Sequence, residues 1–333
     1  MYRLVQRRGI IGLFCLLFVA SSVVPGWAQK DNRFEVSKNL DIFNSLLKEV
    51  EMFYVDSVDV DKTVQRGIEA MLAGLDPYTE YYPEQKTEEL SLMTTGEYGG
   101  IGSLIRQRNN EGGVMIAEPT EGMPADLAGL KPGDLILAID TIDVSKATNS
   151  RVSELLKGVP NTKMVLTIQR PGEKKPRKFE ITRKQITTPQ VTYYGVKNDS
   201  IGYIYLKAFT IKSAQEVKEA FLDLKKNHNI KSLVLDLRGN GGGVLEGAVQ
   251  IVGMFVPKGS EVLSTKGKIK QWDRTYRTST EPLDTVMPLA ILINGGTASA
   301  AEIVSGSLQD MDRAVLVGQR SFGKGLVQAP RDL

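Results

Sequence analysis

From about residue 191 onward, the sequence alternates short apolar runs with amphipathic stretches, and this alternation constrains the fold more than any other feature. Runs rich in β-branched and aliphatic residues predict strands, and the stretches between them have the spacing of helices. We expect strands and helices to alternate in the order 201–206, 213–226, 232–237, 244–255, 289–293, 298–308 and 314–317. This order favours a layered α/β domain.

Two residues in this segment offer a nucleophile and a base. Ser299 lies between a predicted strand and the helix that follows it, and Lys324 comes shortly after the last predicted strand. A serine hydroxyl attacks poorly until a neighbouring base removes its proton. The only histidine, His228, lies in a polar connector between a helix and a strand, which argues against a Ser-His-Asp triad. A Ser-Lys pair is therefore the leading alternative.

A lysine acts as a base only where its surroundings disfavour the charged ammonium form. Phe322, Leu326 and Val327 supply apolar neighbours for Lys324, and Gln328 follows two strand-like steps beyond Leu326, where its amide could orient the amine. An ordinary surface lysine is the competing interpretation.

Two further patterns compete for Lys324. Ser321 and Lys324 have the Ser-x-x-Lys spacing of penicillin-binding enzymes, which requires a helical turn that Gly323 and Gly325 disfavour. The run 318–324 matches most of a phosphate-binding loop, but Gly325 stands where a serine or threonine should bind magnesium. Ser299 remains the better nucleophile.

Acyl transfer also needs donors for the oxyanion that develops on the substrate. The N–H of Ala300 would lie at a helix start, where amides are unpaired and the helix dipole favours negative charge. The glycine-rich turn 239–243 could supply a second donor, for which we choose Gly242. A simple strand-to-helix connection would explain one or two of these glycines, but not four.

Five separated features resemble the carboxyl-terminal processing proteases. They are the run Thr297-Ala-Ser-Ala-Ala-Glu-Ile303, the Lys324 and Gln328 that follow it, and the segments 75–81, 96–102 and 235–243. The resemblance implies a crotonase-like α/β protease core at 188–333 with an inserted PDZ domain. It implies that Ser299 is the nucleophile, that Lys324 is the general base and acid, and that Gln328 orients Lys324. It implies no metal or organic cofactor. Gly241 stands where the family commonly has proline, which could loosen the turn.

Residues 96–187, with short strands and turns, resemble a PDZ domain. Its carboxylate-binding loop and edge strand would comprise Gly100, Ile101, Gly102, Ser103 and Leu104. Consecutive backbone N–H groups there could hold a terminal carboxylate while the peptide adds as a strand. The expected partners are proteins or peptides with accessible C-termini. A simple turn is the alternative for this loop, and a non-catalytic peptide-binding module is the alternative for the whole chain.

The first 28 residues have the pattern of a secretory signal. Arginines precede an apolar stretch at 10–20, and Gly26-Trp-Ala28 resembles a cleavage site. We expect export across the inner membrane to the periplasm, whereas an uncleaved leader would tie the chain to the membrane. The segment 29–95 predicts two amphipathic helices. The second is capped by Asp61, has its apolar positions between Val64 and Leu75, and ends near Gly74 and Pro77.

Composition limits the remaining partners. The formal net charge of +3 falls to zero without the three arginines of the leader, so nothing favours nucleic acid. The basic run 174–184 reads as a solvated hairpin edge. The sequence stops at Leu333, nine residues past Lys324 and in mid-pattern, so we expect further strands to follow. The sequence leaves open whether the protein forms a homo-oligomer.

Overall fold

The computed structural model describes residues 33–84, 87–108 and 112–332. Contacts divide the chain into two units, residues 1–81 and 82–333, which are treated separately. The predicted leader at 1–28 lies outside the described residues. Of the helices that the structure describes, none is long and apolar enough to cross a membrane.

The first unit contains the two expected helices, α2 (Arg33–Phe53) and α3 (Val60–Ala73). The predicted cap of the second helix is wrong by two residues: Asp59, not Asp61, adopts the extended N-cap conformation and accepts a hydrogen bond from the Lys62 N–H at 3.1 Å. Asp61 lies in the first helical turn, where its negative charge favours the positive end of the helix dipole. Leu75 lies beyond the helix, which ends at Ala73.

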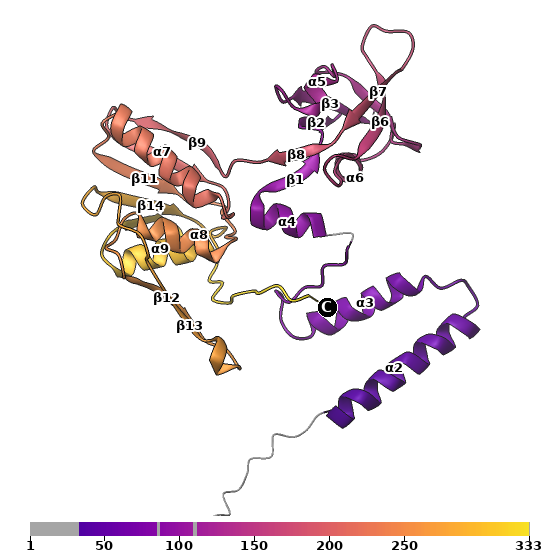
Figure 1. The fold of residues 1–333 in the computed structure, drawn as a ribbon, viewed down its shortest axis with the longest axis horizontal. Coiled ribbons are helices and arrows are strands. Elements are labelled where there is room, and N and C mark those ends of the chain that lie inside the picture. Colours follow the sequence, from indigo (N-terminus) through magenta and orange to yellow (C-terminus); the bar gives the residue numbers. More distant parts are fainter. Residues whose placement is uncertain (1–32, 85–86, 109–111, 333) are drawn as a thin grey trace, which may run out of the picture. The chain divides into compact units, whose positions relative to one another are not determined.

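An antiparallel sheet forms the segment that was expected to be a PDZ domain (Figure 1). The order is β2 (Ser103–Gln107), β3 (Val114–Pro119), β4 (Leu135–Ile139), β6 (Lys163–Gln169) and β7 (Arg177–Thr182), with β5 (Ile142–Asp143) beside β4. Helices α5 (Pro124–Leu127) and α6 (Asn149–Leu156) accompany the sheet. Alternate residues of the strands are buried, including Ile136, Leu166 and Ile168 at 2% exposure or less, so one face of the sheet builds the core.

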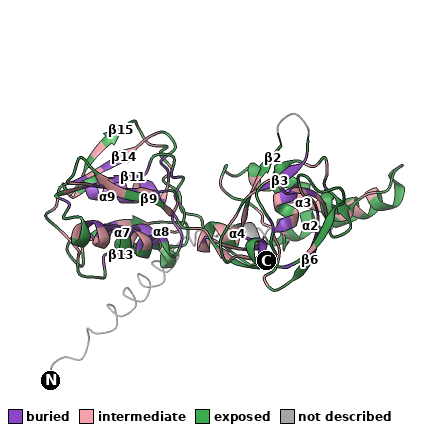
Figure 2. Ribbon diagram, turned by 90° about the horizontal axis from the view of Figure 1, so that it is seen from above, coloured by how far each residue is buried: buried purple, intermediate pink, exposed green. Residues whose placement is uncertain are grey.

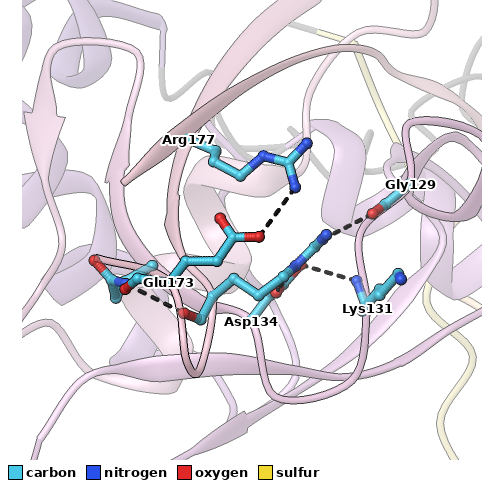
Figure 3. A network of polar contacts seen from close by, with 7 residues as sticks. Gly129, Lys131, Asp134, Glu173 and Arg177 are labelled. Atoms are coloured by element: carbon cyan, nitrogen blue, oxygen red, sulfur yellow. Dashed lines mark hydrogen bonds and ion pairs between the residues drawn. The ribbon is translucent and has the colours of Figure 1, made fainter. Parts of the chain in front are cut away.

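One buried ion pair ties this domain together (Figure 3). Asp134, at the start of β4, has no exposed surface, and both of its oxygens accept hydrogen bonds from Arg170, at 2.8 and 2.7 Å. Arg170 also donates to the Gly129 carbonyl, and the Lys131 N–H donates to Asp134. Burial alone would raise the pKa of Asp134, but these bonds and the guanidinium charge outweigh it and lower that pKa. The carboxylate is therefore charged and fully paired at neutral pH.

A separate two-stranded ribbon carries the chain into and out of the PDZ domain. Helix α4 (Thr87–Thr95) leads into β1 (Glu97–Gly100), which pairs antiparallel with β8 (Lys184–Thr187). The ribbon admits only glycine at one point, because a Cβ on Gly99 would lie 1.8 Å from the Gly158 carbonyl oxygen. The sequence did not predict this pairing.

The C-terminal part of the second unit is built on a five-stranded sheet of order β15-β14-β11-β10-β9. Strands β10 (Ile201–Leu206), β11 (Ser232–Asp236), β14 (Leu289–Ile293) and β15 (Val315–Gly318) are parallel, and β9 (Val191–Lys197) is antiparallel to β10. The connecting helices are α7 (Ser213–Asn227), α8 (Leu245–Gly253) and α9 (Ala300–Asp310). The expected α/β alternation is confirmed.

The register of the sheet explains where the core lies. Ile204, Leu235 and Ile291 are neighbours across three strands, and all three are fully buried in one cluster with residues of α7, α8 and α9. In Figure 2, buried positions (purple) occur on strands of this sheet and on the helices that cover it. Burial of one face in this way is what fixes the register of the strands.

Two further segments complete this part. A hairpin of β12 (Glu261–Thr265) and β13 (Arg274–Arg277) encloses the 3₁₀ turn η2 (Lys270–Trp272). After β15, residues 319–332 form neither helix nor strand, so the expected strand character around Leu326 is wrong. A strand needs a neighbour for its backbone groups, and none of the described strands pairs with this segment.

Candidate active site

The candidate site lies where three adjacent parallel strands end. The glycine-rich turn 239–243 follows β11, the loop 294–299 follows β14, and the segment with Lys324 follows β15. The carboxyl ends of parallel strands meet at one edge of a sheet, where open α/β folds bind their ligands. Residues far apart in sequence therefore come together at this edge.

Hydrogen bonds join the first two loops. The Asn294 side-chain oxygen accepts from the Gly239 N–H at 2.9 Å, and the Ala298 N–H donates to the Asn240 carbonyl at 2.9 Å. The Thr297 hydroxyl, which is fully buried, donates to the Leu237 carbonyl at 2.8 Å. The position of Ser299 is thus fixed relative to the glycine-rich turn.

Ser299 has an unusual backbone conformation, with φ of 56° and ψ of −117°. Non-glycine residues rarely adopt positive φ, and such strain gathers at functional sites. The strain also explains a boundary: helix α9 begins at Ala300, two residues later than expected, because Ser299 cannot continue a helix in this conformation. The side chain is held at a sharp strand-to-helix turn.

The expected oxyanion donors lie beside Ser299. A Cβ on Gly242, whose φ is 97°, would lie 2.8 Å from the Ser299 Cβ and 2.9 Å from the Ala300 nitrogen. Ala300 is the first residue of α9, where an amide has no partner within the helix. The Gly242 N–H donates to the Asn240 side-chain oxygen at 2.9 Å, so it would have to exchange this bond to reach a substrate.

Lys324 and Gln328 are in direct contact. The Lys324 Nζ donates to Gln328 Oε1 at 2.6 Å. Lys324 is partly buried, but Phe322, Leu326 and Val327 are 59%, 53% and 54% exposed. The expectation that these three side chains shield the amine is wrong for this structure, because the segment lacks a neighbouring strand that would bury them.

Glu302 connects the serine to the lysine, and the sequence indicated it only as part of a motif. Its Oε2 accepts from the Ser299 N–H at 2.8 Å and from the Lys324 N–H at 2.9 Å, so those two nitrogens lie at most 5.7 Å apart, the sum of both distances. Its Oε1 accepts from the Ser321 hydroxyl and the Gly323 N–H, both at 2.7 Å. Burial would raise the pKa of Glu302, but the four hydrogen bonds outweigh it and lower that pKa.

A second charged group at this edge was also missed. Asp236, at the end of β11, is 1% exposed and accepts from both the Arg238 guanidinium and the Tyr203 hydroxyl, at 2.6 and 2.5 Å. Burial alone would raise the pKa of Asp236, but the hydrogen bonds from these donors and the guanidinium charge outweigh burial, so the pKa is lowered. The ion pair fixes the start of the turn 239–243. The sequence signal for this ion pair was that Asp236 and Arg238 flank Leu237 at the end of an apolar run.

The predicted peptide-binding loop lies at an edge of the PDZ sheet. Strand β2, with Ser103 and Leu104, has only β3 as its neighbour among the described strands, and Leu104 is 56% exposed. Gly100 ends β1, and Ile101 is buried in the domain core. Gly102 has a φ of 65°, and a Cβ there would lie 2.4 Å from the Met123 Cβ. The loop therefore requires glycine, and β2 leaves an edge to which a further strand can add.

Fold and site together define a serine-type peptidase with a PDZ domain. Residues 200–333 match the sequence profile of peptidase family S41, and residues 115–170 match that of a PDZ domain. The carboxy-terminal-processing protease of Bartonella bacilliformis is 36% identical over 316 residues, which cover 94% of this chain and 70% of that relative. The chain belongs to this family of carboxy-terminal-processing proteases.

Other relatives give the same family. A probable CtpA-like serine protease of Staphylococcus aureus is 33% identical over 298 residues, which cover 88% of this chain and 58% of that protein. The chain thus spans somewhat more than half the length of the staphylococcal relative. The solved structure of the photosystem II D1 C-terminal processing protease is 30% identical over 86% of this chain and 77% of its own, with a TM-score of 0.45.

Proposed function

We propose that this protein is an endopeptidase that binds the C-terminal tail of a polypeptide in its PDZ domain and cleaves the polypeptide through an acyl-enzyme on Ser299. One observation carries the proposal: Glu302 holds the backbones of Ser299 and Lys324 on one carboxylate oxygen, beside the glycine-rich turn. A strained serine at a helix start, a tethered lysine and a nearby amide are the parts that acyl transfer needs.

The chemistry follows from these parts. Neutral Lys324 takes the proton from the Ser299 hydroxyl as the serine oxygen bonds to the substrate carbonyl carbon. The resulting ammonium gives its proton to the leaving amine, so the peptide C–N bond breaks and an ester remains. Water then attacks the ester, giving a proton to Lys324, which returns it to the serine oxygen as the acid leaves. Gln328 keeps the amine oriented, as its 2.6 Å contact with Lys324 supports.

Negative charge on the carbonyl oxygen needs donors in both tetrahedral intermediates. The N–H of Ala300, at the positive end of the α9 dipole, is the first donor. The N–H of Gly242 is the second, after it exchanges its bond to Asn240 for one to the substrate. Removing one such donor typically costs a factor of about 10² to 10³ in kcat.

Substrate selection rests on the PDZ domain. The carboxylate of the tail would bind at Gly100, Ile101 and Gly102, while the residues before it add as a strand beside β2. A peptide amide has no terminal charge, so it should bind several-fold more weakly than the free acid. Equal affinity for acid and amide peptides would exclude this loop as the binding site.

The catalytic roles are tested with casein, an unstructured protein. Ser299→Ala and Lys324→Ala should each abolish cleavage while leaving the thermal unfolding curve in place, and the double variant should be no worse than either single one. Ser321→Ala should cleave casein far faster than Ser299→Ala, because Ser321 is a donor to Glu302 and not the nucleophile. Cleavage of casein by Ser299→Ala at the wild-type rate would remove Ser299 as the nucleophile.

The expected location is the periplasm. The positive start, apolar stretch and small-residue site of residues 1–28 support export and cleavage there. Fractionation of cells should place the mature chain, shortened by about 28 residues, in the periplasmic fraction. Recovery of the unshortened chain with membranes would favour the uncleaved leader instead.

A further inference from the structure

The segment that carries Lys324 is attached to the core around the start of α9. Residues 319–332 lack regular secondary structure, and two backbone bonds hold their first part, from the Gln319 N–H to the Ile293 carbonyl and from the Phe322 N–H to the Thr297 carbonyl. Three further bonds hold Ser321, Gly323 and Lys324, and all three end on the side chain of Glu302. Three of the bonds that hold the segment next to the lysine therefore end on one side chain.

The same side chain also holds the strained serine. Glu302 lies one helical turn after Ser299 and returns to accept its backbone N–H at 2.8 Å. Each carboxylate oxygen thus receives two donors, and Oε2 is shared between the serine and the lysine backbones. Movement of the lysine segment would have to break bonds to the group that supports the nucleophile.

Only a carboxylate of this length suits the four donors. An ionised carboxylate is purely an acceptor, with room for about four hydrogen bonds. A glutamine would turn its NH₂ group toward two of the four donors and leave them unpaired. An aspartate is one methylene too short to span from α9 to the lysine segment. The geometry therefore requires an ionised glutamate at position 302.

We propose that Glu302 is a positioning residue that sets the working separation of Ser299 and Lys324. It touches neither substrate nor reacting atoms and acts through the backbones of both residues. The inference rests on the proposed function in so far as Ser299 and Lys324 perform the chemistry. The hydrogen bonds that join both backbones to Glu302, however, can be measured by amide hydrogen exchange without catalysis.

The test compares three variants of the full chain: Glu302→Gln, Ser321→Ala and Glu246→Gln. Glu246→Gln is the matched control, because it makes the same change at an exposed glutamate in the first turn of α8. Ser321→Ala removes one of the four donors but leaves the three N–H bonds. Each variant is measured for kcat and KM on casein and for amide hydrogen exchange.

For Glu302→Gln we expect kcat to fall on the order of a hundredfold, the cost of a misplacement of about 1 Å, with KM within about twofold. Exchange should accelerate at Ser299, Gly323 and Lys324, and stay unchanged in β4 of the PDZ domain. A loss of stability alone would instead accelerate exchange throughout α9. The control Glu246→Gln should stay within about threefold of wild type, and Ser321→Ala, which keeps the three N–H bonds to Glu302, should lie between that control and Glu302→Gln.

Activity and hydrogen exchange together decide the inference. If Ser299→Ala is inactive while Glu302→Gln keeps the wild-type kcat, the inference fails and the proposed function stands. If Ser299→Ala cleaves casein normally, the proposed function fails. Accelerated exchange at Gly323 and Lys324 in Glu302→Gln would then still support the structural role of Glu302. Unchanged exchange at those amides would overturn it.

Discussion

Removing Arg170, the partner of the buried Asp134, should destabilise the PDZ domain far more than breaking an exposed ion pair would. In Arg170→Leu, the Asp134 carboxylate would lose both guanidinium bonds while remaining completely buried, with only the Lys131 N–H as a donor. Breaking a buried pair from one side costs about 3–5 kcal/mol, because an uncompensated charge stays in the interior. The neighbouring pair of Arg177 and Glu173, half-exposed at 3.2 Å, gives the contrast: Glu173→Gln should cost roughly 0.5 kcal/mol or less.

Hydrogen exchange in β4 and β6 measures this difference directly, since their amides exchange through opening of the domain. A cost of 3 kcal/mol predicts exchange at least about a hundredfold faster in Arg170→Leu than in wild type. The pKa of Asp134 is lowered in the folded chain, so its contribution is present above the unfolded pKa of about 3.9 and is lost as pH falls through the folded value. The gap between wild type and variant should therefore narrow toward pH 3. An effect below about threefold at pH 7, matching Glu173→Gln, would refute the reasoning.

Three further changes have defined outcomes. Gly242→Ala places a Cβ 2.8 Å from the Ser299 Cβ and should lower kcat on casein by roughly 10² to 10³, with peptide affinity unchanged. Gly102→Ala, at a φ of 65°, should weaken binding of a fluorescent C-terminal peptide at least about tenfold, measured by anisotropy, without loss of protease activity on an acyl-ester substrate. Burial raises the pKa of Asp284, but Lys225 and two backbone N–H groups bring it down to about 2. Asp284→Asn should thus cost about 2 kcal/mol at pH 7 and flatten the loss of stability between about pH 4 and pH 2 in thermal unfolding.

The elements read correctly from sequence are those whose burial shows as a pattern of side chains. Strands 201–206 and 289–293 were predicted to the residue, because alternating burial leaves apolar residues at every second position. The ribbon of β1 and β8 and the β12–β13 hairpin were missed, since these strands have only four or five residues each, mix apolar residues with polar residues or glycine, and depend on pairing with another segment.

The candidate residues could be named from the sequence, but not the way in which they are held. Residue types and spacing together with the resemblance to the processing proteases indicated Ser299, Lys324 and Gln328, and the structure brings Lys324 and Gln328 into contact. The role of Glu302 could not be read, because two of its partners are backbone amides 21 and 22 positions away. The start of α9 was placed too early for a related reason: nothing in the sequence says that Ser299 adopts a positive φ.

The ribbon of β1 and β8 makes the PDZ domain a replaceable part. Gly100 faces Lys184, so the chain leaves the ribbon for the PDZ domain and returns to it at points one strand spacing apart, roughly 5 Å. A domain attached through such closely spaced ends can be exchanged for another, or for a tight turn, without stretching the sheet that bears Ser299. Under the proposed function, a change of tail specificity would therefore require only a new insert between residues 100 and 184.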